Sequence, residues 1–117
     1  MRHRKATKIL SRESHVRKAL MRNLLTSFVI YGKIKTTEAK AKAVRPRLER
    51  LITVAKGGTL ADRRSVQKTL DTEKAVKVMM ETVAPKMKDR NGGYTRIVKL
   101  GPRKGDGAEI VQLELTA

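Results

Sequence analysis

The chain has 117 residues, of which 39% are apolar and 3% aromatic, so it can bury one core, built mainly from Leu, Val, Ile, Ala and Met. It has no Cys, which excludes disulfides, thiolate metal sites and Cys nucleophiles. Lys and Arg number 28 against 11 Asp and Glu, and the net charge of +17 favours a polyanionic partner over a soluble basic enzyme. Nucleic acid is the first candidate, and an anionic membrane surface is the second.

The start of the chain is a basic segment. Residues 1–13 contain five Lys or Arg and one acid, with Ile9 and Leu10 as the only large apolar pair. Such a segment buries too little apolar surface to order itself, so we predict an extended arm at 1–13 and one globular domain at 14–117. The alternative is an ordinary frayed terminus. Residues 1–5 start like a signal peptide, but polar residues 11–15 replace its apolar region, which predicts a cytoplasmic protein.

The first helix is predicted from Ser14, as its cap, to Gly32. Apolar residues recur there at three- and four-residue spacing and predict the buried face. These residues are Val16, Leu20, Leu24, Phe28 and Tyr31. The opposite side carries His15, Lys18 and Arg22, while Leu25 and Val29 interrupt this polar stripe.

A short strand is predicted at 33–36, followed by a helix that Thr37 caps. The apolar face of this helix contains Ala41, Val44, Leu48, Leu51, Ile52 and Ala55. Pro46 lies inside the pattern, on the side away from this face, and has no N–H to donate. The helix must therefore kink at Pro46 or break near Arg45, and the unbroken apolar register favours the kink.

Residues 57–58 are both Gly and end that helix. A capping box at Thr59 to Asp62 predicts a third helix to about Leu70. Asp71 is predicted to cap a fourth helix, in which Val76, Met79, Met80 and Val83 face the core and which Pro85 closes or bends.

The last third of the chain predicts strands at 94–100 and 109–115, joined by a turn at 101–107 that is rich in Gly. Two strands alone are marginal, so the strand at 33–36 is expected to make a third. The predicted fold is therefore α+β. About four helices pack on one face of a small three-stranded, mostly antiparallel sheet, with an extended basic N-terminal arm.

The sequence lacks the residue patterns of a catalytic or metal site. His3 and His15 have no acidic or His partner at a ligand spacing, and acids such as Glu38, Asp62 and Glu73 fall in the first turns of helices, where capping explains them. Residues 57–60 lack the phosphate-loop pattern. We predict that the chain is not an enzyme and needs no cofactor, metal or small-molecule substrate.

Three regions concentrate positive charge: the arm, the stretch from Lys33 to Arg50, and the hairpin around Arg103 and Lys104. Each Lys or Arg placed on a phosphate releases counterions, which favours binding whatever the base sequence. The scarcity of aromatics argues against a stacking platform for single strands, and no clear helix-turn-helix is present. Recognition is therefore expected to rest on phosphate, 2′-hydroxyl and RNA shape. A sequence-tolerant, nucleoid-type DNA binder is the alternative.

Several motifs occur in the order of a known family. They include the opening Met-Arg-His-Arg-Lys, the run Ile34-Lys35-Thr36-Thr37 followed by Lys40-Ala41-Lys42, and the run Gly92-Gly93-Tyr94-Thr95-Arg96-Ile97. On these motifs the chain resembles bacterial-type large-subunit ribosomal protein seventeen along nearly its whole length. The resemblance implies binding of large-subunit ribosomal RNA near the peptide tunnel exit, beside neighbouring ribosomal proteins including ribosomal protein thirty-two. It implies no contact with a membrane.

The resemblance also implies RNA-facing residues, carried over by matching motif. These are Arg2, His3, Arg4, Lys5, Lys8, Arg12, Arg22, Lys35, Lys40, Lys42, Arg64, Tyr94 and Arg96. The polar stripe of the first helix and the basic stretches add His15, Lys18, Lys33, Arg103 and Lys104.

Overall fold

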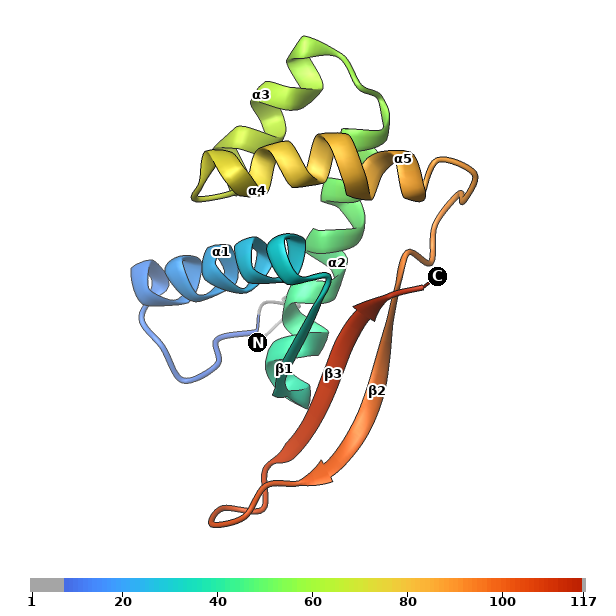
Figure 1. Cartoon of the computed structure of the whole chain (residues 1–117). Helices are drawn as coiled ribbons and strands as arrows, with labels where there is room; N and C mark the ends of the chain where they lie inside the picture. Colours follow the sequence, from blue (N-terminus) through green and yellow to red (C-terminus); the bar gives the residue numbers. More distant parts are fainter. Residues whose placement is uncertain (1–7, 117) are drawn as a thin grey trace, which may run out of the picture.

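The computed structural model describes residues 8–116 and confirms the α+β class (Figure 1). The predicted residues Arg2, His3, Arg4 and Lys5 lie outside this range. The elements in chain order are α1 (Ser14–Tyr31), β1 (Lys33–Thr37), α2 (Glu38–Lys56), α3 (Leu60–Thr69), α4 (Glu73–Val78), the π-helical turn η1 (Met79–Val83), α5 (Ala84–Lys86), β2 (Thr95–Pro102) and β3 (Glu109–Leu115).

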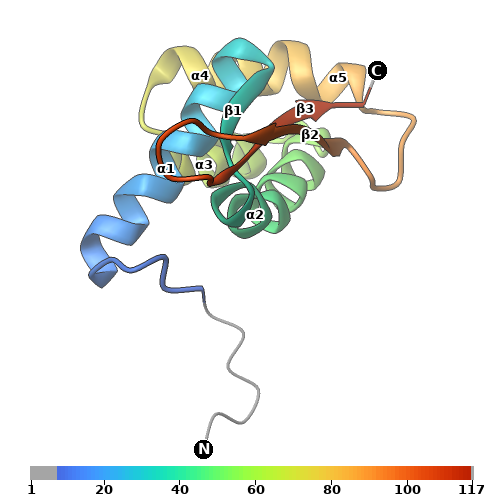
Figure 2. The same cartoon turned by 90° about the horizontal axis from the view of Figure 1, so that it is seen from below.

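The three strands form one sheet in the order β1-β3-β2, and both pairings are antiparallel. Helix α2 contacts all three strands and covers one face of the sheet (Figures 1 and 2). Helix α1 meets β1 at the edge, while α3 and α4 pack against other helices. The β2–β3 hairpin extends away from the helices, at the end of the molecule opposite α3 (Figure 1).

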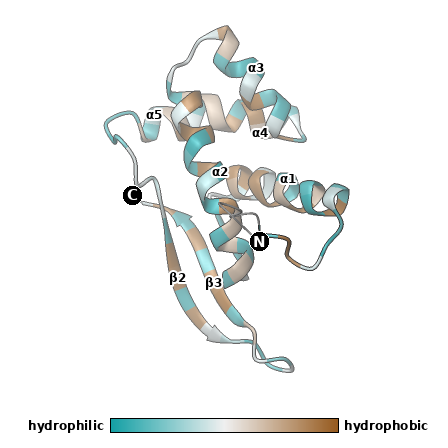
Figure 3. Ribbon diagram, turned by 180° about the vertical axis from the view of Figure 1, so that it is seen from behind, coloured by the Kyte–Doolittle hydropathy of each residue, from teal (hydrophilic) through white to brown (hydrophobic). Residues whose placement is uncertain are grey.

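Alternation along the strands separates the two faces of the sheet, because successive side chains point to opposite sides. Ile34, Leu113 and Ile97 lie in one cross-strand row and join the core on the α2 side. Lys33, Glu114 and Arg96 make the neighbouring row and therefore point to the outer face. Hydrophobic and hydrophilic residues alternate along β2 and β3 in Figure 3.

The buried face of α1 agrees only in part with the predicted one. Phe28 is buried, and Leu20 and Leu24 pack against the core, as predicted. Val16 and Tyr31, at the two ends of the predicted face, are 43% and 74% exposed, whereas Met21, Leu25 and Val29 are buried. Two apolar stripes lie side by side on this helix, and α1 packs between α2 and α4, which selects the second stripe. Periodicity alone does not decide between such neighbouring stripes.

Helix α2 follows the prediction. Its six predicted apolar residues are all buried. The helix runs from Glu38 to Lys56 without interruption, so the alternative of a break near Arg45 is wrong. Pro46 is exposed, as predicted from its position on the wheel.

The predicted caps give a mixed result. Thr59 and Asp62 form the predicted capping box, with each backbone N–H donating to the other residue's side chain (3.1 and 3.2 Å). The prediction that Asp71 caps α4 is wrong by one residue, because Thr72 accepts the N–H of Ala75 (3.2 Å). Ser14 is not the cap of α1 either, since it is already the first helical residue.

The helix predicted to close or bend at Pro85 ends at Lys86, directly after a π-helical turn. The N–H of Ala84 donates to Met79 O, five residues back, just before the proline. A proline within a helix removes one hydrogen bond and crowds the carbonyl four residues earlier, and the wider π turn accommodates that carbonyl. Met79 and Val83 stay buried on the inner side of this turn.

The end of the predicted arm forms a turn at residues 9–12 just before α1. Leu10 and Ser11 both have φ of +54°, and the Arg12 N–H donates to Ile9 O (3.2 Å). The Arg12 guanidinium donates to Leu10 O (2.7 Å) and closes this turn. Leu10 packs against the core, which anchors the chain just before α1.

Candidate nucleic-acid interface

The outer face of the sheet carries cations on both edge strands. Lys33 and Arg96 flank Glu114 in one row, and Lys35 lies opposite Gln112 two residues along. Arg96 Nε is 2.6 Å from Glu114 Oε1, and this hydrogen bond is the main cause that lowers the pKa of Glu114. One carboxylate is thus shared between two flanking cations, and the predicted residues Lys33, Lys35 and Arg96 form a single exposed surface.

A second basic group lies at the start of α2. Lys42 is exposed and pairs with Glu38 at 2.9 Å, and its hydrogen bond is the largest cause that lowers the pKa of Glu38. Lys99 on β2 acts on Glu38 in the same direction, which places this hairpin residue near the helix start. Lys40 is half-buried. One acid therefore faces several cations here too.

At the hairpin tip, one of the two predicted cations shapes the turn. The Arg103 guanidinium holds Asp106 through two hydrogen bonds of 3.1 and 2.5 Å. These bonds, together with the Ala108 N–H, lower the pKa of Asp106 from 3.8 to about 2. The ion pair keeps the turn compact, and Lys104 is exposed beside it.

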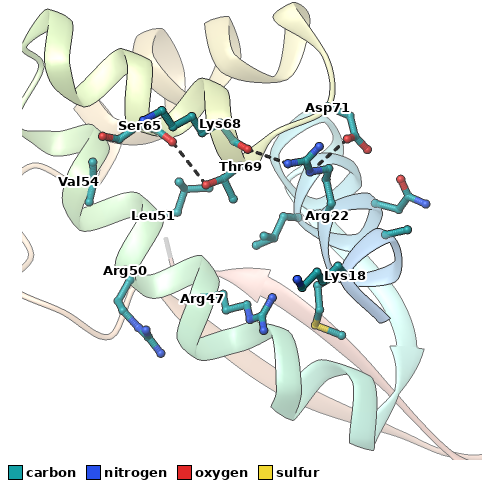
Figure 4. A pocket seen from close by; sticks show the side chains of 14 residues that line it. Lys18, Arg22, Arg47, Arg50, Leu51, Val54, Ser65, Lys68, Thr69 and Asp71 are labelled. Carbon is teal, nitrogen blue, oxygen red and sulfur yellow. Dashed lines mark hydrogen bonds and ion pairs between the residues drawn. The ribbon is translucent and has the colours of Figure 1, made fainter. Parts of the chain in front are cut away.

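A groove lies between α1, α2 and α3 and has a cavity volume of about 940 Å³ (Figure 4). Lys18 and Arg22 line it from α1, as parts of the predicted polar stripe. Arg22 is held in place, because it donates to Lys68 O (2.8 Å) and lies 3.5 Å from Asp71.

Three further cations line this groove and are not among the individually predicted RNA-binding residues: Arg47 and Arg50, which fall within the predicted basic stretch, and Lys68. A signal for two of them exists in α2, because positions 47, 50 and 54 have helical spacing and form a stripe beside the buried face. Lys68 comes from α3 and reaches the same groove only through the packing of α3 against α2. Nothing in its local sequence marks it.

The remaining predicted cations do not join one surface. Lys8 is exposed in the segment before α1, where Arg12 is half-buried and supports the turn described above. His15 is exposed, with Nδ1 3.6 Å from a Glu13 carboxylate oxygen. Arg64 is exposed on α3 but does not line the groove.

Tyr94 does not belong to the candidate interface, because its side chain is buried. Its side chain is 2% exposed, and its hydroxyl is 3.3 Å from Thr53 Oγ1 and 3.1 Å from Lys56 Nζ. These two hydrogen bonds, led by that of Thr53, lower the pKa of Tyr94. Lys56 Nζ also lies 5.0 Å from the ring centroid, within cation–π range. A ring enclosed in this way has no face to offer to a base, so the prediction for Tyr94 is wrong.

The motif around Tyr94 instead joins the hairpin to α2. Glu49 accepts the N–H of Tyr94 (3.1 Å), the N–H of Thr95 (3.0 Å) and the Thr95 hydroxyl (2.6 Å). Arg45 donates to Thr95 O (3.0 Å) and Thr95 Oγ1 (3.2 Å). We call Arg45, Glu49, Tyr94 and Thr95 together the Glu49 latch. The latch holds the hairpin against α2, and the Arg45 guanidinium already donates its hydrogen bonds to Thr95 within it.

Over residues 8–116 no cluster of three or more His, Asp or Glu side chains could hold a metal ion. Within the same range no helix is long and apolar enough to cross a membrane. The surface chemistry that remains is that of exposed cations with few acids.

Comparison with known proteins assigns the chain to a family. The family model described as Ribosomal protein L17 matches residues 20–116. The chain belongs to the ribosomal protein L17 family. Relatives called Large ribosomal subunit protein bL17 are 53% identical in Clostridium perfringens (strain SM101) and 54% identical in Clostridium botulinum (strain Hall). Each match spans 106 residues, 91% of this chain and 94% of the relative. The family confirms the resemblance read from the motifs and the prediction that the chain is not an enzyme.

Proposed function

We propose that the protein is a structural constituent of the large ribosomal subunit, in the cytoplasm, where it binds large-subunit ribosomal RNA and stabilises its folded form. The relatives' name, Large ribosomal subunit protein bL17, supports the assignment of this protein to the large ribosomal subunit. The observation that supports RNA binding is the placement of cations on separate elements around few acids: the outer face of the sheet, the start of α2 and the groove. Folded RNA presents phosphates from several directions to such a surface.

The predicted RNA-binding residues of the globular domain fall into three groups. Lys33, Lys35 and Arg96 bind phosphates on the outer face of the sheet. Lys40, Lys42 and Lys104 bind along one side of the hairpin and the start of α2. Lys18 and Arg22 lie at the groove, and His15, Arg64, Lys8 and Arg12 extend the contacts around the helices. Arg103 acts through the shape of the turn.

The arm is the fourth contact in this proposal. Arg2, His3, Arg4 and Lys5 are predicted to reach RNA beyond the globular domain of residues 14–117. The turn at Leu10 and Ser11, with Leu10 packed against the core, fixes the position at which such an arm leaves the globular domain. The proposed position is near the peptide tunnel exit, beside neighbouring proteins including ribosomal protein thirty-two.

Sedimentation of a cell lysate at moderate salt tests the function. The protein is expected to sediment in the large-subunit peak, and its absence from that peak would contradict the proposed function. Recovery with chromosomal DNA instead would support the alternative of a sequence-tolerant DNA binder. Cross-linking within the purified subunit tests the neighbours, because the proposal requires cross-links to ribosomal protein thirty-two and to proteins at the tunnel exit.

A further inference from the structure

The walls of the groove between α1, α2 and α3 are rich in Lys and Arg side chains. Lys18 stands on one wall, Arg47 and Arg50 on another, and Lys68 on the third (Figure 4). Asp71 is the only acid among the lining residues, and Arg22 already pairs with it. The opening therefore presents cations from three helices to whatever enters it.

The floor of the groove is apolar but narrow. Met21 and Leu25 line it yet are only 3% and 2% exposed, and Leu51 is 6% exposed. Val54, at 37%, is the exposed large apolar residue of the lining. A docked amphipathic helix needs a row of exposed apolar contacts along several turns, which this floor lacks. A single flat apolar group fits it better.

The α3 wall supplies hydrogen-bond acceptors. The Ser65 hydroxyl donates to Ala61 O (3.1 Å) and the Thr69 hydroxyl donates to Ser65 O (3.4 Å). Because each hydrogen is used within the helix, the oxygen lone pairs remain for a donor in the groove. A nucleobase has both properties, an apolar face and N–H donors at its edge, and it is attached to phosphates that suit the cations.

We propose that this groove holds one unstacked nucleotide of the bound RNA. The base lies on Val54 and Leu51 and donates to the hydroxyl oxygens of the α3 wall. The flanking phosphates lie on Arg47 and Arg50 on one side and Lys18 on the other. A volume of about 940 Å³ is sufficient, since sites for small organic ligands span about 300–1,000 Å³. Extruded bases are held by apolar side chains and edge hydrogen bonds in this manner. The inference rests on the proposed RNA-binding function and adds a specific subsite to it.

The first test places a photo-cross-linking amino acid, benzoylphenylalanine, at Val54 in intact large subunits, with Leu60 as the control position. Leu60 is 63% exposed at the start of α3 and does not line the groove. The expected result is a cross-link from position 54 to a single nucleotide of large-subunit RNA. A cross-link to a protein instead would overturn the proposal in favour of a peptide occupant. The absence of any cross-link from assembled subunits would overturn it as well.

The second test compares two variants that lose the same charge, Arg47→Gln with Arg50→Gln in the groove, and Lys74→Gln with Lys77→Gln on α4. Purified large-subunit RNA is the probe, and circular dichroism checks that both variants fold. The groove variant is expected to bind more weakly than the α4 variant and to lower the log–log salt slope of binding by about 1.4 relative to it, because Arg47 and Arg50 each hold a phosphate in this proposal. Equal affinities would overturn the groove proposal while leaving RNA binding intact. No RNA binding by the unaltered protein would overturn the proposed function itself.

Discussion

The Glu49 latch leads to the most specific prediction about stability. Glu49 accepts two backbone N–H groups, those of Tyr94 and Thr95, and both residues are only 2% exposed. Glu49→Ala removes both carboxylate oxygens at once and leaves these two N–H groups, and the Thr95 hydroxyl, without their acceptor. An unsatisfied buried donor costs about 1–3 kcal/mol. The Glu49 side chain is 21% exposed, so water can reach part of the gap, and we expect a loss of about 2–4 kcal/mol.

Glu49→Gln separates the hydrogen bonds from the packing. An amide keeps one acceptor oxygen and turns its NH₂ toward the other backbone donor, so it can satisfy only one of the two N–H groups. The Gln variant should therefore lose more than half of what the Ala variant loses. An ordinary surface carboxylate would show no such effect. Glu81→Ala, at an exposed position of the π-helical turn, is the matched control and should stay within about 0.5 kcal/mol.

Urea unfolding followed by circular dichroism measures these losses, with an unchanged m-value required for each variant. Hydrogen exchange of the Tyr94 and Thr95 amides gives a local readout, because both should lose protection in the Ala variant. The reasoning would be refuted if Glu49→Ala were no more destabilising than Glu81→Ala. It would also be refuted if Gln restored full stability, since one oxygen would then suffice.

Four further predictions follow from other parts of the molecule. Leu48→Ala, at a fully buried position of α2, should lower the free energy of unfolding by about 2–4 kcal/mol in the same urea assay. Gly32→Ala should cost about 1–2 kcal/mol, because φ is +76° there, and no loss would contradict the left-handed cap. The carboxyl of Asp106 should titrate near pH 2 when followed by NMR, and Arg103→Ala should move this midpoint back toward 3.8. Because the pKa of Asp106 is lowered in the folded state, its ion pair with Arg103 stabilises the fold above pH 3.8, and this stabilisation is lost as the pH falls to about 2. Deletion of residues 2–12 should reduce the salt-dependence slope of RNA binding by roughly 3 to 4, and an unchanged slope would show that the arm makes no phosphate contacts.

Much of the secondary structure could be predicted because its causes are local. The capping box at Thr59 depends on residues three positions apart, and the end of α1 at Gly32 depends on one residue that adopts a positive φ without strain. The apolar face of α2 contains six residues in one unbroken register, so no second stripe competed with it. In α1 two stripes did compete, and the choice depended on a partner helix that the local pattern does not contain.

The candidate interface shows the same division. A basic surface on α2 and the hairpin could be read from the charges alone, because cations with so few acids must lie on the outside. The role of Tyr94 could not, since the partners that enclose it, Thr53 and Lys56, are 41 and 38 positions earlier. Aromatic residues serve both cores and RNA surfaces, and only burial distinguishes the two uses.

By itself, then, the sequence determined the family, the α+β class, the large excess of positive charge and most of the helix and strand positions, all of which depend on composition, motif order or short-range spacing. Only the tertiary structure decided that Glu49 holds the hairpin to α2, that Tyr94 lies inside, and that cations of three helices surround one groove. The physical reason is that these features are contacts between residues far apart in the chain. Their partners are chosen by how the helices pack, and a local pattern carries no record of that choice.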